Sequence, residues 1–346
     1  MLILRPVAPQ DLDDLLALAS QLDSMNLPRD ADFLADRIAT SERSFAAALG
    51  TGPSDDPERA VYVFVAVDVA SGRVVGTSLI LAKNGRPGAP YYWLEVSTEE
   101  RRSPELGKRF LHRKLRLCST EDGPTEVGGI ILDPEWRHHP AKCGKALSVV
   151  RFAFISAHPA RFEREVIAEM LSPFEASGHN LLWDAFGARF TGLPYREADH
   201  LSARSKQFIA DLFPRDPVYA TLFPEEVQRV IGQPGNTAKA AVRILEKVGF
   251  QPLNHVDPFD GGPYYGASRD TLHPVRERRE LVLPGVPAKG ATDPEAALAL
   301  LSTEAGPGFR ATVVPLDGDG APLVGQACRE ALGVVAGDRV SITPLP

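Results

Sequence analysis

The stretch that decides the fold is Glu126–Ser148, which reads EVGGIILDPEWRHHPAKCGKALS. It begins as an apolar run typical of a strand, passes through a turn rich in Arg, His, Lys and Gly, and continues as a helix. The free N–H groups and the positive dipole end at the start of a helix attract anions, and Arg137, Lys142 and Lys145 add cationic side chains. The pattern therefore indicates a cradle for the pyrophosphate of coenzyme A.

The overall composition narrows the kinds of ligand and the location that we expect. The chain has 346 residues, 44% of them hydrophobic and 24% charged, which suits one large elaborated domain or two domains. A formal net charge of −7 argues against a nucleic-acid partner and leaves the basic turn as a local patch for a small anionic ligand. No apolar run approaches the roughly 18 residues of a membrane span, so we expect a cytoplasmic protein with no membrane contact.

The cysteines give no sign of a disulfide framework or a metal site. Cys118, Cys143 and Cys328 lie far apart and form no CxxC pair. We therefore expect reduced thiols and no bound metal. Cys143 lies in the basic turn, where cations could make a thiol reactive, but a small packing residue is the expected role.

Hydrophobic patterning in the first half of the chain predicts a mixed α/β arrangement. A strand at Leu2–Pro6 is followed by helices near Leu15–Leu22 and Asp30–Leu49. An antiparallel meander comes next, with Ser71-Gly72-Arg73 as a hairpin signal, and it leads to the helix at about Gly144–Ala157. The predicted strands between these helices are Val61–Val69, Val74–Leu81, Tyr91–Val96 and Val127–Leu132.

The second half is organised around one strand and one helix. Arg164–Met170 reads as a buried strand that carries a carboxylate, Glu169, near its end, and such a carboxylate must be paired or border a cavity. Asn236–Phe250 has the apolar stripe of a helix, with Gly249 as a terminating residue. The aromatic and proline-containing residues 171–235 between them predict a helical insertion.

The C-terminal part reads as a separate appendage. Residues 1–284 form the predicted core, and the stretch 285–308, rich in Ala, Gly and Pro, is the predicted linker, although Asp293–Leu301 could be a short helix. Residues 309–346 are the predicted small β-rich extension. Its expected elements are strands at Phe309–Leu316 and Val340–Leu345 around a helical piece at Gly325–Leu332.

Several motifs carry a family resemblance. A strand, a cationic turn and a helix, followed by a second helix reading AVRILEKVGF, resemble the GNAT acyltransferases. Their turn signature is Arg/Gln-x-x-Gly-x-Gly/Ala, which Arg137, Gly144 and Ala146 match with a longer gap after the arginine. Motifs along essentially the whole chain, including Ala336–Val340, look like the arginine N-succinyltransferase family. The others are Leu132–Arg137, Val166–Met170, Trp183–Phe190, Phe208–Pro214, Val230–Gln233 and Phe259–Pro263.

The resemblance implies a fold and a reaction. It implies a GNAT-like mixed sheet flanked by helices, and transfer of a succinyl group from succinyl-CoA to the α-amino group of arginine or ornithine, in arginine catabolism. Succinyl-CoA is then a co-substrate, with no permanently bound cofactor, and a homo-oligomer or a dimer with a related subunit is suggested. In GNAT-type transfer the amine attacks the thioester directly, so the protein positions two substrates, accepts a proton and stabilises an oxyanion.

The resemblance and the ligand chemistry together assign the site residues. Ile130 matches the family's succinyl-CoA contact. Glu169 and Asp260 lie in matching motifs, and paired carboxylates suit a planar guanidinium. If Gly261–Pro263 is only a turn, Asp260 serves that turn instead. The predicted cofactor-binding residues are Ile130, Leu132, Arg137, Lys142, Gly144 and Lys145.

One departure from the family concerns the proton carrier. The family's proposed histidine follows the Ile-Gly-Gln segment, whereas Gln233 is followed here by Pro234. His255 is the nearest alternative by sequence and is the predicted catalytic residue, although a histidine leaving a strand can also simply bond a carbonyl. The missing histidine keeps two other functions open. One is an acyl-CoA-binding regulatory or partner subunit with reduced catalysis, and the other is an N-acyltransferase with a different acyl donor or amine.

Overall fold

The computed structural model describes residues 1–346 except 21–27, 176, 203–204, 286–295 and 306–307. Most strands are short, and one pair is much longer than the rest. Within the described residues the strands are β1 (Leu2–Pro6), β2 (Val61–Asp68), β3 (Val74–Leu81), β4 (Tyr91–Ser103), β5 (Lys108–Thr120), β6 (Thr125–Leu132), β7 (Glu165–Glu169), β8 (Val218–Tyr219), β9 (Gln251–Val256), β10 (Pro263–Ser268), β11 (Arg279–Val282), β12 (Leu298–Thr303), β13 (Arg310–Pro315) and β14 (Arg339–Pro344).

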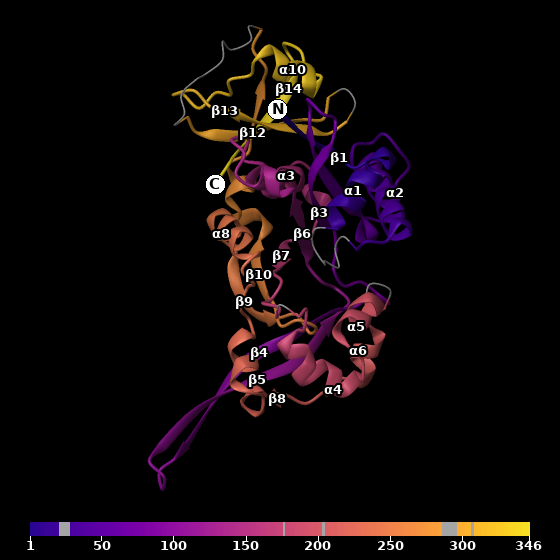
Figure 1. The fold of residues 1–346 in the computed structure, drawn as a ribbon. Helices are drawn as coiled ribbons and strands as arrows, with labels where there is room; N and C mark the ends of the chain where they lie inside the picture. The colour runs from indigo at the N-terminus through magenta and orange to yellow at the C-terminus, as the bar shows by residue number, and fades with distance from the viewer. Residues whose placement is uncertain (21–27, 176, 203–204, 286–295, 306–307) are drawn as a thin grey trace.

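All of these strands join one mixed sheet, in the order β11-β14-β12-β13-β1-β2-β3-β6-β7-β10-β9-β4-β5-β8. Figure 1 shows the C-terminal strands at one end of the molecule, the β4–β5 hairpin at the other and helices beside the middle strands. This arrangement confirms the predicted mixed α/β sheet flanked by helices. The described α-helices are α1 (Leu12–Ala19), α2 (Ala31–Ala48), α3 (Cys143–Ala157), α4 (Ala188–Thr191), α5 (Tyr195–Ser202), α6 (Gln207–Leu212), α7 (Glu225–Val230), α8 (Lys239–Val248), α9 (His273–Arg276) and α10 (Gln326–Leu332).

Helices cover both faces of the middle strands. On one face, α1 and α2 pack over Val63, Val65 and Leu79. On the other face, α3 packs over Phe64 and Val127. Because successive residues of a strand point to opposite faces, the apolar run of β2 supplies both cores. The same alternation determines which residues of neighbouring strands lie on one face of the sheet and can contact each other.

The pair β6 and β7 is parallel, whereas the other paired strands of the sheet are antiparallel. Only two residue pairs are in register, Thr125 with Val166 and Glu126 with Ile167. From Val127 onward, the edge of β6 that faces β7 has no strand partner. An open edge therefore runs along the end of β6 toward the basic turn.

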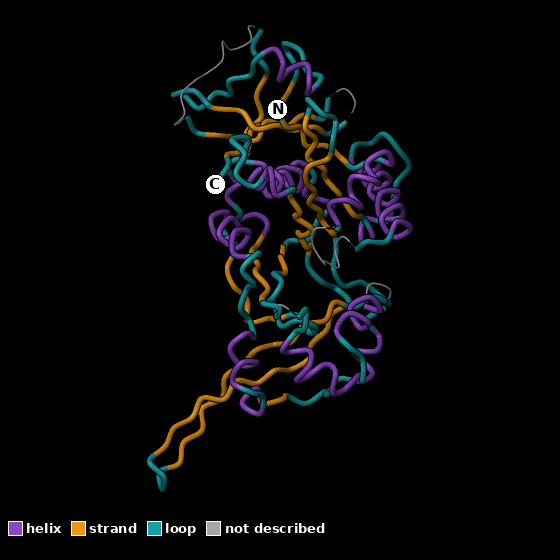
Figure 2. The backbone as a smooth tube through the Cα atoms, in the orientation of Figure 1, coloured by secondary structure: helices purple, strands orange, loops and turns teal. Residues whose placement is uncertain are grey.

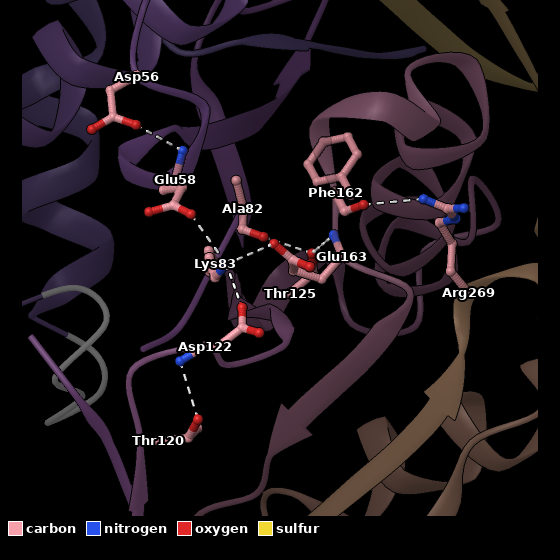
Figure 3. Close-up of polar contacts among 10 residues, drawn as sticks. All are labelled: Asp56, Glu58, Ala82, Lys83, Thr120, Asp122, Thr125, Phe162, Glu163 and Arg269. Atoms are coloured by element: carbon pink, nitrogen blue, oxygen red, sulfur yellow. Dashed lines mark hydrogen bonds and ion pairs between the residues drawn. The ribbon is translucent and has the colours of Figure 1, made fainter. Parts of the chain in front are cut away.

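A network around Lys83 holds the starts of these two strands together (Figure 3). The ammonium of Lys83 lies 2.6 Å from a carboxylate oxygen of Asp122, 3.1 Å from Glu58 and 3.2 Å from Glu163. Thr125, the first residue of β6, accepts a hydrogen bond from the N–H of Glu163 at 2.8 Å. The strands are thus fixed at their starts, and the opening lies toward their ends.

The described part of residues 171–235 forms a second, mostly helical lobe. It contains α4 to α7, the π-helix Trp183–Gly187 and the short strand β8, and it packs on β4, β5 and β9. The Trp183 ring stacks on Phe259, with 5.2 Å between ring centroids. Figure 2 shows these short purple helices gathered beside the lower strands. This packing fixes the turn after β9 against the insertion.

The predicted linker is wrong over part of its length. Leu298–Thr303 is strand β12, which pairs with β13 on one side and β14 on the other. The short helix expected at Asp293–Leu301 is therefore also wrong from residue 298 onward, and residues 286–295 lie outside the described residues. An Ala-rich apolar run has no strong local preference, and pairing with two neighbouring strands decides it. The C-terminal strands then continue the sheet through β13 and β1, where Leu4 faces Ala311.

The β4–β5 hairpin is far longer than the strand predicted at Tyr91–Val96. Both strands have 13 residues, and Figure 1 shows them projecting away from the body. Strand β9 pairs with β4 only as far as Glu95, and β8 pairs with β5 only at Lys114 and Leu115. The outer part of the hairpin is thus a two-stranded arm.

None of the helices within the described residues combines the length and apolar character needed to cross a membrane.

Candidate active site

A bulge in β6 shapes the open edge. The register with β3 shifts between Thr77 and Leu79, and Gly129 opposite them has φ +60°. A Cβ on Gly129 would lie 2.8 Å from side-chain atoms of Leu79, so only glycine fits without a shift. The bulge changes the direction of the backbone just before Ile130 and Leu132. Both predicted cofactor-binding residues are partly buried on this strand.

The basic turn ends in a left-handed residue at the start of α3. Lys142 has φ +51° and is the only non-glycine residue with positive φ in the described chain. The first helical hydrogen bond runs from the N–H of Ala146 to the carbonyl of Lys142, at 3.0 Å. The N–H groups of Cys143, Gly144 and Lys145 therefore precede the helical ladder and are available to an anion. A strained backbone at this position is consistent with a ligand-binding turn.

Three lysines converge at the start of α3. Burial lowers the pKa of Lys145, and the charges of Lys247 and Lys142 lower it further. Lys247 lies at the end of α8, which packs beside α3, and sequence reasoning missed it because only the tertiary structure brings the two helices together. The Lys145 ammonium also donates a hydrogen bond to the carbonyl oxygen of Pro346. Because these cations repel one another at the start of a helix, binding of a pyrophosphate among them would be favourable.

The other residues of the turn have distinct environments. A Cβ on Gly144 would have only Leu132 nearby, at 3.9 Å, so this glycine leaves open space beside the strand end. Arg137 is exposed just after the 3₁₀ turn Pro134–Trp136. Cys143 is buried, and burial raises the pKa of its thiol to about 11, which favours the packing role over a reactive thiol.

A second cluster lies where β7 ends and the turn after β9 begins. Glu169, Asp257 and Asp260 each place a carboxylate oxygen within 4.8 Å of the others. Asp257 and Asp260 are each 2% exposed, whereas Glu169 is partly exposed. The hydroxyl of Tyr264 donates to Oε2 of Glu169 at 2.9 Å. The structure thus brings Glu169 and Asp260 into one cluster that also contains Asp257, and the substrate-binding role of Glu169 and Asp260 stays a prediction.

The two aspartates differ in their free hydrogen-bonding capacity. Both oxygens of Asp260 accept backbone N–H groups, from Ser172 at 2.9 Å and from Gly262 at 2.6 Å. Asp257 uses Oδ1 for the N–H groups of Phe259 and Asp260, and its Oδ2 is buried with no hydrogen-bond partner among the described residues. The reading of Asp260 as a turn residue therefore has direct support. Asp257, which the sequence analysis missed, offers the free acceptor.

Burial and mutual repulsion make this cluster attractive to a cation. Burial raises the pKa of Glu169 well above its ordinary value, and the Asp257 charge raises it further. The pKa of Asp260 is raised to about 7 by burial and by Asp257. Lys206 opposes the rise for Glu169 and Asp257. A bound cation would relieve the remaining repulsion, and a guanidinium or a metal ion meets that requirement chemically.

His255 lies at the far end of a row of aromatic rings. Its ring lies 5.0 Å from Trp93, which stacks on Tyr91 at 5.1 Å, and Tyr91 meets Tyr264 at 5.6 Å between centroids. Burial lowers the pKa of His255. The row thus separates His255 from Glu169, and the catalytic role of His255 stays a prediction.

The position of the absent histidine lies beside the acidic cluster. The N–H of Gly235 donates to the carbonyl of Leu171 at 2.8 Å, and the N–H of Gly232 donates to the carbonyl of Gly261 at 2.9 Å. The loop that contains Pro234 is therefore held between the end of β7 and the turn that carries the aspartates. Sequence reasoning could identify the missing residue but not its neighbours.

Comparisons with known proteins identify the family of the chain. The profile of the family described as arginine N-succinyltransferase beta subunit matches residues 2–274. Proteins named arginine N-succinyltransferase from Citrobacter koseri and Yersinia pseudotuberculosis are each 34% identical over 100% of this chain and 98% of theirs. The solved arginine/ornithine succinyltransferase subunit AI from Pseudomonas aeruginosa matches with a TM-score of 0.84 and 29% identity, over 100% of this chain and 99% of that one. The resemblance to the arginine N-succinyltransferase family is confirmed, and the chain belongs to that family.

Proposed function

We propose that this chain transfers the succinyl group of succinyl-CoA to the α-amino group of arginine, with ornithine as a second acceptor. The observation that supports arginine as the acceptor is the cluster of Glu169, Asp257 and Asp260. In this cluster Oδ2 of Asp257 has no hydrogen-bond partner among the described residues. A guanidinium supplies planar paired donors to such oxygens. The names of the relatives point to the same substrate.

The donor would lie along β6 and the basic turn. The N–H groups at the start of α3, together with Lys142, Lys145 and Lys247, suit the pyrophosphate. Arg137 and Gly144 border the same turn. The open edge of β6 from the bulge to Leu132, including Ile130, would bond the pantetheine and receive the thioester. Succinyl-CoA is thus a co-substrate that leaves as free CoA.

The reaction needs a proton acceptor as well as two binding sites. The neutral α-amine attacks the thioester carbon, the C–N bond forms as the C–S bond breaks, the nitrogen loses one proton to a base, and the CoA thiolate gains a proton. His255 is the proposed base, because its lowered pKa keeps it neutral at pH 7. Glu169 is the alternative, since it is partly exposed and lies in the cluster itself.

A thiol-release assay tests the function. Purified protein is mixed with succinyl-CoA and with arginine, ornithine or no amine, and free CoA is followed. Release that requires arginine supports the proposal. Tight CoA binding without amine-dependent release would contradict it and support the acyl-CoA-binding subunit, which the Pro234 substitution favours. Release with another donor or amine would indicate the third alternative, and unchanged release in the presence of EDTA would exclude a metal requirement in the acidic cluster.

We further propose that the β4–β5 arm contacts a second copy of the chain or a related subunit. Leu106, Phe110 and Leu111 at its outer end are 66%, 54% and 61% exposed. Phe110 and Leu111 are adjacent, so they point to opposite faces of the ribbon. A two-stranded ribbon with apolar residues on both faces is stabilised when another surface covers it.

A further inference from the structure

Arg37 is a half-buried cation in which one buried donor has no partner among the described residues. It lies on α2 between Leu34 and Ile38, which both enter the core against the sheet. The guanidinium lies over the Phe33 ring, 5.0 Å from its centroid. Its Nη1 atom is buried and has no hydrogen-bond partner among the described residues. Burial lowers the pKa of Arg37, yet arginine keeps its charge throughout the physiological pH range.

Two carboxylates act on Arg37 from a distance without engaging this donor. The charges of Glu126 and Asp36 raise its pKa against the effect of burial. Glu126 accepts its hydrogen bond from the side-chain amide of Asn84 instead. A charged donor that is buried and unpaired is costly, so a native site of this kind calls for an anionic partner.

The location of Arg37 ties it to the acyltransfer site. The charge of Glu126 acts on Arg37, and Glu126 pairs with Ile167 where β6 and β7 meet. Ile167 and Glu169 alternate onto the same face of β7, whereas Val166 faces the core beneath α3. Arg37 therefore acts on the face where the acidic cluster lies, and the two have opposite charge.

We propose that Arg37 binds a substrate carboxylate, either the distal carboxylate of the succinyl group or the α-carboxylate of the amino acid. A guanidinium donates two parallel hydrogen bonds to a carboxylate, which suits selection of either group over a neutral analogue. The acidic cluster would repel the same anion, so a separate cationic position is needed for it. This inference rests on the proposed acyltransfer and adds a determinant of substrate choice.

Two substrate ratios test the inference and identify the source of the carboxylate. The first compares kcat/KM for succinyl-CoA with that for butyryl-CoA, which lacks the distal carboxylate. The second compares arginine with agmatine, which is arginine without its α-carboxylate. In Arg37→Met we expect one of these preferences to fall roughly 10- to 100-fold, as loss of a charge-assisted bond predicts. A fall in the first ratio identifies the succinyl group, and a fall in the second identifies the amino acid.

Controls separate a specific role from a general one. Arg43→Met removes an exposed arginine of the same helix, whose guanidinium bonds only Thr40 in the described chain, and should leave both ratios unchanged. Arg37→Lys keeps the charge and should retain part of the preference. Because each ratio is measured within one preparation, a smaller folded fraction changes neither. Both ratios unchanged in Arg37→Met would overturn the inference, whereas absence of transfer by the wild-type chain would overturn the proposed function instead.

Discussion

Asp257 and Asp260 share one turn but contribute differently to the site. Both oxygens of Asp260 accept hydrogen bonds, from the N–H groups of Ser172 and Gly262, and these bonds hold the turn against the end of β7. Asp257 uses one oxygen for the turn, and its other oxygen has no hydrogen-bond partner among the described residues. The number of uncommitted acceptor atoms, rather than the presence of a carboxylate, decides which residue can bind a cation.

Asp257→Asn tests this difference. The amide oxygen can still accept the N–H groups of Phe259 and Asp260, so the turn should persist, while one negative charge is lost. We expect the KM for arginine to rise roughly 10- to 100-fold and the KM for succinyl-CoA to stay constant. The melting temperature should not fall, because a repulsive charge is removed. Asp319→Asn, at an exposed turn, is the control, and an unchanged KM for arginine in Asp257→Asn would exclude the assignment.

The pH dependence of turnover distinguishes the two proposed bases. If His255 takes the proton, kcat/KM should rise with pH through an inflection below 6.5 and then level off, because burial lowers the pKa of this histidine. His255→Ala should then lower turnover roughly 100-fold or more and abolish that inflection. If Glu169 acts instead, whose pKa is raised by burial, the inflection should persist in His255→Ala. Unchanged turnover in His255→Ala removes this residue from the mechanism.

At the scale of elements, β6 combines a fixed start with an open end. Lys83 and Thr125 tie its first residue to the chain leading into β7. Beyond Glu126 the pairing with β7 stops, and the bulge at Gly129 turns the strand toward the basic turn. A parallel pair that stops after two residues leaves backbone donors and acceptors for a ligand, whereas a fully paired sheet would use them internally.

Gly129→Ala should damage this element specifically. The new Cβ meets Leu79 at 2.8 Å on a backbone with φ +60°, so we expect a loss of about 2–4 kcal/mol in the free energy of unfolding and a higher KM for succinyl-CoA. Gly72→Ala is the matched control, since Gly72 has φ +73° but nothing within 4 Å. It should cost only about 1 kcal/mol and leave KM unchanged. Equal losses in the two variants, measured by chemical denaturation, would contradict the crowding argument.

At the scale of the whole molecule, the arm makes a prediction about association. Leu111→Asp places a charge on the exposed apolar end of the β4–β5 hairpin, and sedimentation velocity should then show a smaller assembly than for the wild-type chain. Val335→Asp is the control, because Val335 is 66% exposed, close to the 61% of Leu111, but lies in the C-terminal part. An identical assembly in Leu111→Asp would show that the arm end is not the contact.

Much of the whole-molecule plan could be predicted from local patterns. The strand–turn–helix of the basic turn, the strand ending at Glu169 and the helical insertion all have signals within about 20 residues, in periodicity or in terminating glycines. The outer hairpin was missed because residues 97–113 are dominated by charged side chains, which favour no buried face. β12 was missed because its neighbours in the sheet, rather than its composition, make it a strand.

By itself, the sequence determined the family, the mixed α/β class and the basic turn that leads into α3, because each depends on residues close together in the chain. Only the tertiary structure decided the rest. It placed Lys247 beside the cradle, Asp257 beside Glu169, and Arg37 on the face where β6 and β7 separate. It also placed three aromatic rings between His255 and Glu169. Burial, free hydrogen-bonding capacity and the distances between charges set the chemistry of the site, and all three arise when segments far apart in the chain pack together.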